Sequence, residues 1–246
     1  MDYPRHTEQV TFFDSDKDFL GRVSAARIFD VLQRGATAHA ALLGVGMTDL
    51  MKDGHSWMIS AMSVELLKQP EAMEPLTLTT WPSGVKKRVV CTRDYEITDA
   101  SGAVVSRAVS DWIYVDVENR KICMLTPQLA SLAPEGVPRA DVAPGPKAIE
   151  KTGEHHSAQV LVRRSDTDIN RHVNNVHYVE WLFEAMPEEV YARNLVRLDI
   201  TYRQEAMPGD AIESEVWIGN DGATTFHALT RTADGAVVAT ARCIWR

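Results

Sequence analysis

The residues best suited to chemistry lie in one short polar stretch. Asp166, Asp168, Asn170 and His172 recur there at every second position. If the stretch is extended, this alternation places all four side chains on one face. A carboxylate, an amide and an imidazole suit proton transfer and the binding of developing negative charge. The stretch is therefore the leading candidate for an active site.

A helix is predicted directly after this stretch, because the hydrophobic period changes. Apolar residues recur at helical spacing until Pro187, which ends the run. These are Val173, Val176, Val179, Leu182, Phe183 and Met186. Asn174 and Asn175 are interpreted as cap residues. The first N–H groups of a helix are unpaired and its dipole favours negative charge, so the polar residues stand where an oxyanion could be bound.

Composition and charge exclude several classes of protein. The 246 residues carry a net charge of −8, spread along the chain, and nothing in the pattern indicates a nucleic-acid partner. No apolar run approaches the roughly 18 residues needed to span a bilayer, and the N-terminus lacks a signal-peptide pattern. We therefore expect a cytoplasmic protein without membrane contact. Cys91, Cys123 and Cys243 are expected to be reduced core residues. No cofactor or metal is expected, since the spacing of His172 and His177 does not make a helical zinc pair.

The chain is an internal duplication. The segment that begins near His6 recurs at a shift of 150 residues, and later strands realign at shorter shifts. The matched pairs include His6 with His156, Ser15 with Ser165, Asp16 with Asp166, Asp18 with Asp168, Val23 with Val173, Leu32 with Leu182, Trp81 with Trp217 and Trp112 with Trp245. Each copy predicts one strand, one long helix and a run of antiparallel strands.

In the first copy, Ser24 is expected to cap a long helix that ends at Gly44 and Gly46. Strands are expected at 6–13, 58–67, 76–81, 89–97 and 104–117. A sheet with one apolar face needs a cover, which the helix supplies.

Five of the eleven prolines fall between the copies, which predicts a linker. The expected organisation is an N-terminal domain over 1–125, a Pro-rich linker over 126–150 and a C-terminal catalytic domain over 151–246.

The two copies differ at the candidate site. Leu20 and Arg22 stand where the second copy has Asn170 and His172, so the fold itself does not require the amide and the imidazole. The acids Asp166 and Asp168 recur in the first copy, and we interpret them as partly structural.

Glu205 is matched by Gln69, which cannot accept a proton as a carboxylate can. One copy therefore has the pattern of a working site, and the other has lost it.

The chain resembles the acyl-acyl carrier protein thioesterases, the enzymes that end fatty-acid synthesis, in two motifs. These are Asp168-Ile169-Asn170-Arg171-His172-Val173-Asn174-Asn175-Val176-His177-Tyr178, with Trp181-Leu182 after it, and Tyr202-Arg203-Gln204-Glu205. The resemblance covers nearly the whole chain. It implies an α+β tandem hotdog fold, in which each bent antiparallel sheet wraps round a long helix. It also implicates Asp168, Asn170, His172 and Glu205 as catalytic residues.

The resemblance further implies a bacterial-type enzyme, because no transit segment precedes the domains. Plant members carry a cysteine where this chain has Ala206, so water is favoured as the nucleophile. The predicted function is hydrolysis of fatty acyl-acyl carrier protein thioesters to free fatty acid and holo-carrier. Glu205 would activate water, with Asn170, His172 and the helix start assisting. A carboxylate nucleophile that forms an anhydride is the rival mechanism.

Other functions stay open at this point. An acyl-CoA thioesterase of the same fold would use the same residues with a different carrier, and a non-catalytic acyl-binding protein is a further alternative. A hotdog dehydratase is disfavoured, because its chemistry does not call for this arrangement. The expected partner is an acyl carrier protein bearing a fatty acyl chain, or acyl-CoA, and the expected state is a monomer or a homodimer. The basic cluster at 86–88 is interpreted as a solvated hairpin rather than a docking surface.

Overall fold

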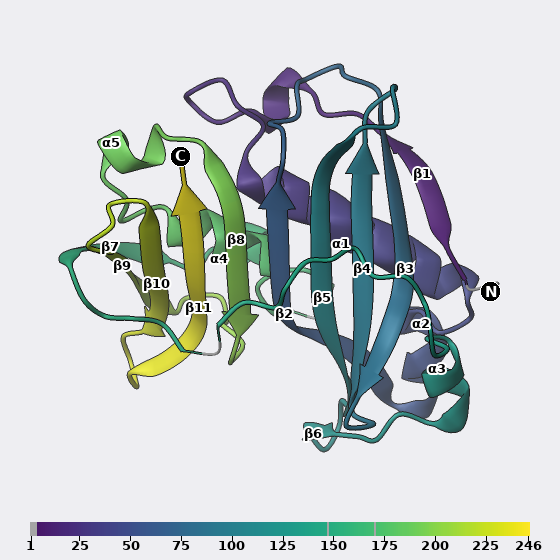
Figure 1. The fold of residues 1–246 in the computed structure, drawn as a ribbon. Coiled ribbons are helices and arrows are strands. Elements are labelled where there is room, and N and C mark those ends of the chain that lie inside the picture. Colours follow the sequence, from purple (N-terminus) through teal and green to yellow (C-terminus); the bar gives the residue numbers. More distant parts are fainter. Residues whose placement is uncertain (1–3, 147, 170) are drawn as a thin grey trace. The chain divides into compact units, whose positions relative to one another are not determined.

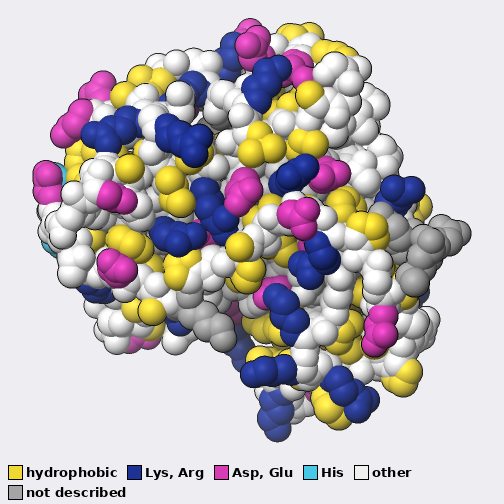
Figure 2. Space-filling view, viewed as in Figure 1, with side chains coloured by type: hydrophobic (Ala, Val, Ile, Leu, Met, Phe, Trp, Pro, Cys, Tyr) yellow, Lys and Arg dark blue, Asp and Glu magenta, His cyan; other side chains and the backbone are white. Residues whose placement is uncertain are grey.

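The computed structural model describes residues 4–146, 148–169 and 171–246, which form two compact units. The first unit comprises Met1–Val23 and Ile28–Ala143, and the second comprises Ser24–Arg27 and Pro144–Arg246. Asn170 lies outside the described residues. Among the described residues, no helix is both long enough and apolar enough to cross a membrane. Acidic and basic side chains lie interspersed on the face drawn in Figure 2, as expected from charges spread along the chain.

The first unit is an antiparallel sheet with a long helix against one face (Figure 1). Its strands are, in spatial order, β1 (His6–Val10), β3 (Leu76–Lys86), β4 (Val90–Thr98), β5 (Val104–Asp116) and β2 (His55–Leu66), with β6 (Lys121–Ile122) paired to β5. The helices are α1 (Ala25–Leu42), α2 (Met47–Leu50) and α3 (Pro127–Ser131). These strands agree with the sequence prediction, apart from shifts of a few residues at their ends.

Helix α1 forms as its sequence predicts. The Ser24 hydroxyl accepts a hydrogen bond from the Arg27 N–H at 3.4 Å, and Gly44 beyond the helix end takes φ of +69°. Gly35 lets the helix approach the sheet, because a Cβ at this position would lie 2.4 Å from Cδ2 of Leu78 on β3.

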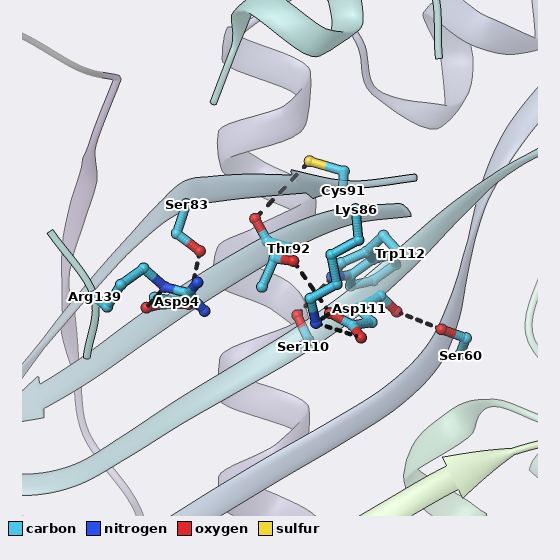
Figure 3. A network of polar contacts seen from close by, with 10 residues as sticks. All are labelled: Ser60, Ser83, Lys86, Cys91, Thr92, Asp94, Ser110, Asp111, Trp112 and Arg139. Carbon is cyan, nitrogen blue, oxygen red and sulfur yellow. Dashed lines mark hydrogen bonds and ion pairs between the residues drawn. The ribbon is translucent and has the colours of Figure 1, made fainter. Parts of the chain in front are cut away.

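A polar network lies on the sheet of the first unit (Figure 3). The carboxylate of Asp94 is 1% exposed and accepts hydrogen bonds from Ser83 Oγ, Arg139 Nε and the Ala140 N–H. The indole of Trp81 also donates to the Pro138 carbonyl at 2.9 Å. This part of the predicted linker is therefore packed against the first unit, and its Val137, Ala140 and Val142 are buried there.

The second unit repeats the arrangement with a shorter helix. Its strands are, in spatial order, β8 (Leu195–Tyr202), β11 (Ala236–Trp245), β10 (Thr224–Arg231), β9 (Ala211–Ile218) and β7 (Glu154–Leu161). Its helices are α4 (Asn175–Leu182) and α5 (Glu188–Tyr191).

Helix α4 ends four residues before the predicted end at Met186. Pro187 explains the difference, because its ring would clash with the carbonyl of Phe183 in a continued helix, and the residue before a proline is disfavoured in helical conformation. The long helix expected in the second copy is thus reduced to eight residues.

Equivalent backbone hydrogen bonds recur in both copies. The Met73 N–H donates to the Phe12 carbonyl at 2.8 Å, and the Gly209 N–H donates to the Val162 carbonyl at 3.0 Å. Both donors take positive φ, +63° at Met73 and +92° at Gly209. The structure therefore supports the duplication at the level of individual backbone groups.

Candidate active site

The described residues of the polar stretch are not extended, so the shared face considered for an extended stretch does not form. It begins with a 3₁₀ turn at Arg164–Asp166 and then forms a tight loop closed by a bridge between Thr167 and Val173. Inside the loop the Asp168 N–H donates to the His172 carbonyl at 3.0 Å. Short polar side chains explain the loop, because Asp and Ser bond nearby backbone groups in competition with strand pairing.

Asp166 has the structural role predicted for it. Its carboxylate accepts the Arg163 N–H at 2.8 Å, and Asp16 accepts the Phe13 N–H at the same distance in the first copy. The acid is therefore retained in both copies because the turn uses it.

The first copy also shows what an acid at the position of Asp168 does for the loop. Asp18 accepts the N–H groups of Leu20 and Arg22, each at 3.0 Å. The backbone of Asp168 repeats that of Asp18, since the Asp18 N–H likewise donates to the Arg22 carbonyl, at 2.7 Å. A loop-holding role for Asp168 is consistent with this match.

The structure brings His172 and Glu205 together, although 33 positions separate them in the sequence. Nδ1 of His172 lies 3.4 Å from Oε1 of Glu205, and the side chains are 35% and 30% exposed. The Val173 N–H donates to the Ala206 carbonyl at 3.2 Å, which joins the loop of His172 to the segment of Glu205. An imidazole and a carboxylate in this partly exposed position can exchange protons with water or with a bound substrate.

The start of helix α4 is partly occupied by its own cap. Asn174 caps the helix as predicted, and its side chain accepts the Val176 N–H at 3.2 Å. Its carbonyl accepts the His177 N–H at 3.0 Å. These two N–H groups already have acceptors and are not free to bind an oxyanion. The helix start can therefore favour an oxyanion mainly through its dipole.

Sequence reasoning missed three residues that hold the Glu205 segment or the helix start. The Tyr178 hydroxyl accepts the Ala206 N–H at 2.8 Å. Tyr202 donates from its hydroxyl to the Asn175 carbonyl at 3.3 Å. Arg231 Nη1 donates to the carbonyl of Glu205 at 3.0 Å. Comparison of the two copies could have identified the two tyrosines, because the first copy has Ile28 and Leu66 at the matched positions.

Cys91 and Cys243 are poor nucleophiles in this structure. Cys243 is buried, as predicted, while Cys91 and Cys123 are partly buried. Burial raises the pKa of the Cys91 thiol to about 11 and raises the pKa of the Cys243 thiol further. In the described part of the chain, no three His, Cys, Asp or Glu side chains are grouped so as to hold a metal ion.

Comparison with known proteins links both halves of the chain to one family. Residues 5–132 match the acyl-ACP thioesterase N-terminal domain, and residues 149–246 match the acyl-ACP thioesterase C-terminal domain. Among curated proteins, the chloroplastic palmitoyl-acyl carrier protein thioesterase of Cuphea hookeriana is 27% identical over 240 residues, which cover 91% of this chain and 58% of that protein. The chloroplastic oleoyl-acyl carrier protein thioesterase of Coriandrum sativum is 27% identical over 209 residues, covering 76% of this chain and 55% of that protein. The chain thus spans less than two thirds of the length of these relatives.

Solved structures confirm the expected α+β double hotdog. An acyl-ACP thioesterase from Bacteroides thetaiotaomicron superposes with a TM-score of 0.86 at 25% identity, covering 99% of this chain and 98% of that one. The 12:0-ACP thioesterase from Umbellularia californica gives a TM-score of 0.85 at 18% identity, with coverage of 100% and 98%, and supports the fold alone.

Proposed function

Because the chain belongs to the acyl-ACP thioesterase family, we propose that it hydrolyses fatty acyl-acyl carrier protein thioesters to free fatty acid and holo-carrier. The observation that carries the proposal is the pairing of His172 with Glu205 in the second unit. The first unit has Arg22 and Gln69 at the matched positions and is proposed to serve the acyl chain instead of the reaction.

In the proposed mechanism, Glu205 is the general base. Its carboxylate takes a proton from water as the water oxygen bonds to the thioester carbonyl carbon. The carbonyl electrons move to oxygen and form a tetrahedral oxyanion. When this collapses, the carbon–sulfur bond breaks and the sulfur leaves as a thiolate. His172 then supplies a proton to the sulfur, and its place 3.4 Å from Glu205 allows the pair to be reset by proton exchange.

Asn170 and Asp168 have supporting roles in this proposal. The Asn170 amide binds the oxyanion, and the dipole at the start of α4 adds favourable potential. Asp168 fixes the loop that carries both Asn170 and His172, as Asp18 does in the first copy.

The test is release of free fatty acid and holo-carrier from an acyl-acyl carrier protein by the purified chain. We expect Glu205→Gln to lower kcat by about 10²- to 10⁴-fold, since it removes a general base and keeps the size of the side chain. Glu184→Gln is the matched control, because it removes the same charge from an exposed residue just beyond α4. Near-normal turnover by Glu205→Gln would refute the assignment.

Two further arms separate the alternatives. Turnover of the same acyl chain on CoA and on carrier protein identifies the preferred carrier. A preference for CoA would make acyl-CoA the substrate in place of the acyl-acyl carrier protein. A single turnover in oxygen-18 water tests the nucleophile, because label that enters an enzyme carboxylate would exclude direct attack by water.

A further inference from the structure

We propose that Tyr178 is a positioning residue for the reaction, and that its hydroxyl holds the Glu205 segment in register with His172. The inference rests on the proposed function of this site. The hydrogen bond that carries the inference joins the Tyr178 hydroxyl to the backbone of Ala206, the residue after Glu205.

The geometry places Ala206 between two anchors. Its N–H donates to the Tyr178 hydroxyl at 2.8 Å, and its carbonyl accepts the Val173 N–H at 3.2 Å. Ala206 is fully buried and directly follows Glu205. Both polar groups of its backbone are thus fixed, the carbonyl by the loop that carries His172 and the N–H by helix α4 directly after it. Fixing these backbone groups restricts the direction in which the neighbouring Glu205 side chain projects from the backbone.

The first copy has lost both partners of this hydrogen bond. Ile28 matches Tyr178 and offers no acceptor, and Pro70 matches Ala206 and has no N–H to donate. The same copy has Gln69 in place of Glu205. A bond required by the hotdog fold would remain in both copies, whereas this one accompanies the carboxylate.

A second tyrosine strengthens the connection. Tyr202 directs its hydroxyl to the Asn175 carbonyl, and its ring meets that of Tyr178 edge to face at 5.6 Å. Its match in the first copy is Leu66. The end of β8, the first turn of α4 and the segment of Glu205 are therefore linked in the second copy by groups absent from the first.

Tyr178 itself is unsuited to proton transfer. It is buried, and burial raises the pKa of its hydroxyl to about 12. The hydroxyl stays protonated at neutral pH and is occupied by a backbone donor. Its contribution to the reaction is therefore geometric.

The experiment removes the hydroxyl and keeps the ring. Tyr178→Phe should lower kcat by about ten- to a hundredfold with little change in KM, because a displacement of about 1 Å in a catalytic group has effects of this size. Tyr95→Phe is the matched control, since it deletes a buried hydroxyl bonded to Ser110 Oγ at 2.9 Å in the first unit. We expect it to lower the melting temperature to a similar extent and to leave kcat unchanged.

A second variant tests the bond from its other side. Ala206→Pro copies Pro70 and removes the donor N–H. Combined with Tyr178→Phe, it should lower kcat no further than the larger single effect, because both changes delete one interaction. Fully multiplicative losses would show that the two residues act independently and would overturn the proposal.

An NMR measurement tests the proposal independently of enzyme activity. The ring-nitrogen signals of His172, recorded at one pH, should shift in Glu205→Gln because the carboxylate is lost, and should shift in the same direction in Tyr178→Phe. A folded Tyr178→Phe protein with wild-type His172 signals and wild-type kcat would assign the tyrosine to packing alone. A wild-type chain that releases no fatty acid would refute the proposed function, and the His172 signals would still decide the positioning role.

Discussion

His227 is expected to make the second unit sensitive to acid. The ring is fully buried, and each nitrogen has a partner. Nδ1 faces the Leu182 carbonyl at 3.0 Å and must donate to it, so Nε2 is left to accept from the Thr225 hydroxyl at 2.8 Å. Trp245 Nε1 donates to the same hydroxyl at 2.9 Å. This chain of hydrogen bonds fits the neutral imidazole.

The size of the effect follows from the pKa of His227. Burial lowers this pKa from 6.5 to about 4, against a smaller opposing influence of the hydrogen bond to Leu182. The unfolded chain therefore binds a proton more readily than the folded chain between these two values. Stability from this residue is complete above pH 6.5, decreases as the pH falls towards 4 and is constant below that. At about 1.4 kcal/mol for each pKa unit, the full loss is about 3 kcal/mol, of which about 2 kcal/mol is lost by pH 5.

The assay compares the wild type with His227→Gln in urea unfolding at several pH values. Glutamine can donate and accept hydrogen bonds but does not titrate. The stability of the His227→Gln variant should therefore lack the pH-dependent contribution of His227. The wild type should exceed the variant most at pH 7.5, and the difference should narrow by about 3 kcal/mol at pH 4. Carboxylates titrate in both proteins and cancel in the difference. His156→Gln controls for loss of a partly exposed imidazole. An equal difference at pH 7.5 and pH 4 would refute the reasoning.

Two further predictions concern the free energy of unfolding. Met73→Gly should raise the free energy of unfolding by about 0.5–1 kcal/mol in urea titrations, because Met73 has φ of +63° where the other copy has Gly209; the exchange Gly209→Met should lower it, and a stabilised Gly209→Met would contradict the argument. Asp94→Asn should cost about 2 kcal/mol, since it leaves the donors of Arg139 and the Ala140 N–H facing an amide in a buried place. Asp111→Asn, on the same sheet, should cost less than about 1 kcal/mol, because the Asp111 side chain is 24% exposed and its Lys86 partner is 45% exposed. Equal losses in the two asparagine variants would contradict the role assigned to burial.

Much of the fold could be predicted because local signals agree with the tertiary structure. Ser24 caps α1 and Asn174 caps α4, as expected. The sequence also placed Glu205 in the site with His172, a pairing that depended on comparison of the copies and on the family resemblance. Each cap is encoded within a few residues, whereas the pairing of Glu205 with His172 was accessible because the first copy lacks both groups.

The remainder depends on contacts that no local pattern carries. The every-second-residue spacing of the acids would suit an extended stretch, but Asp166 and Asp168 lie in a turn and a loop closed by backbone hydrogen bonds. Alternation is a weak signal where the alternating residues are those that bond their own backbone. The partner of the Tyr178 hydroxyl is 28 residues further along the chain, so its role could not be predicted from the motif that contains it.

The two copies separate what the fold needs from what the reaction needs. Both retain an acid that closes the turn and a loop closed by equivalent backbone hydrogen bonds. Both also retain a backbone donor at positive φ, Met73 in the first copy and Gly209 in the second. These backbone features continue in the first copy without Glu205 or His172, so they do not depend on the chemistry. In the proposed mechanism, Tyr178 and the N–H of Ala206, which are specific to the second copy, position one carboxylate beside one imidazole. The two copies share the loop backbone and differ in a few side chains close together. This pattern is expected if a site was built on an existing loop, because side chains on the loop can be replaced without disrupting its backbone hydrogen bonds.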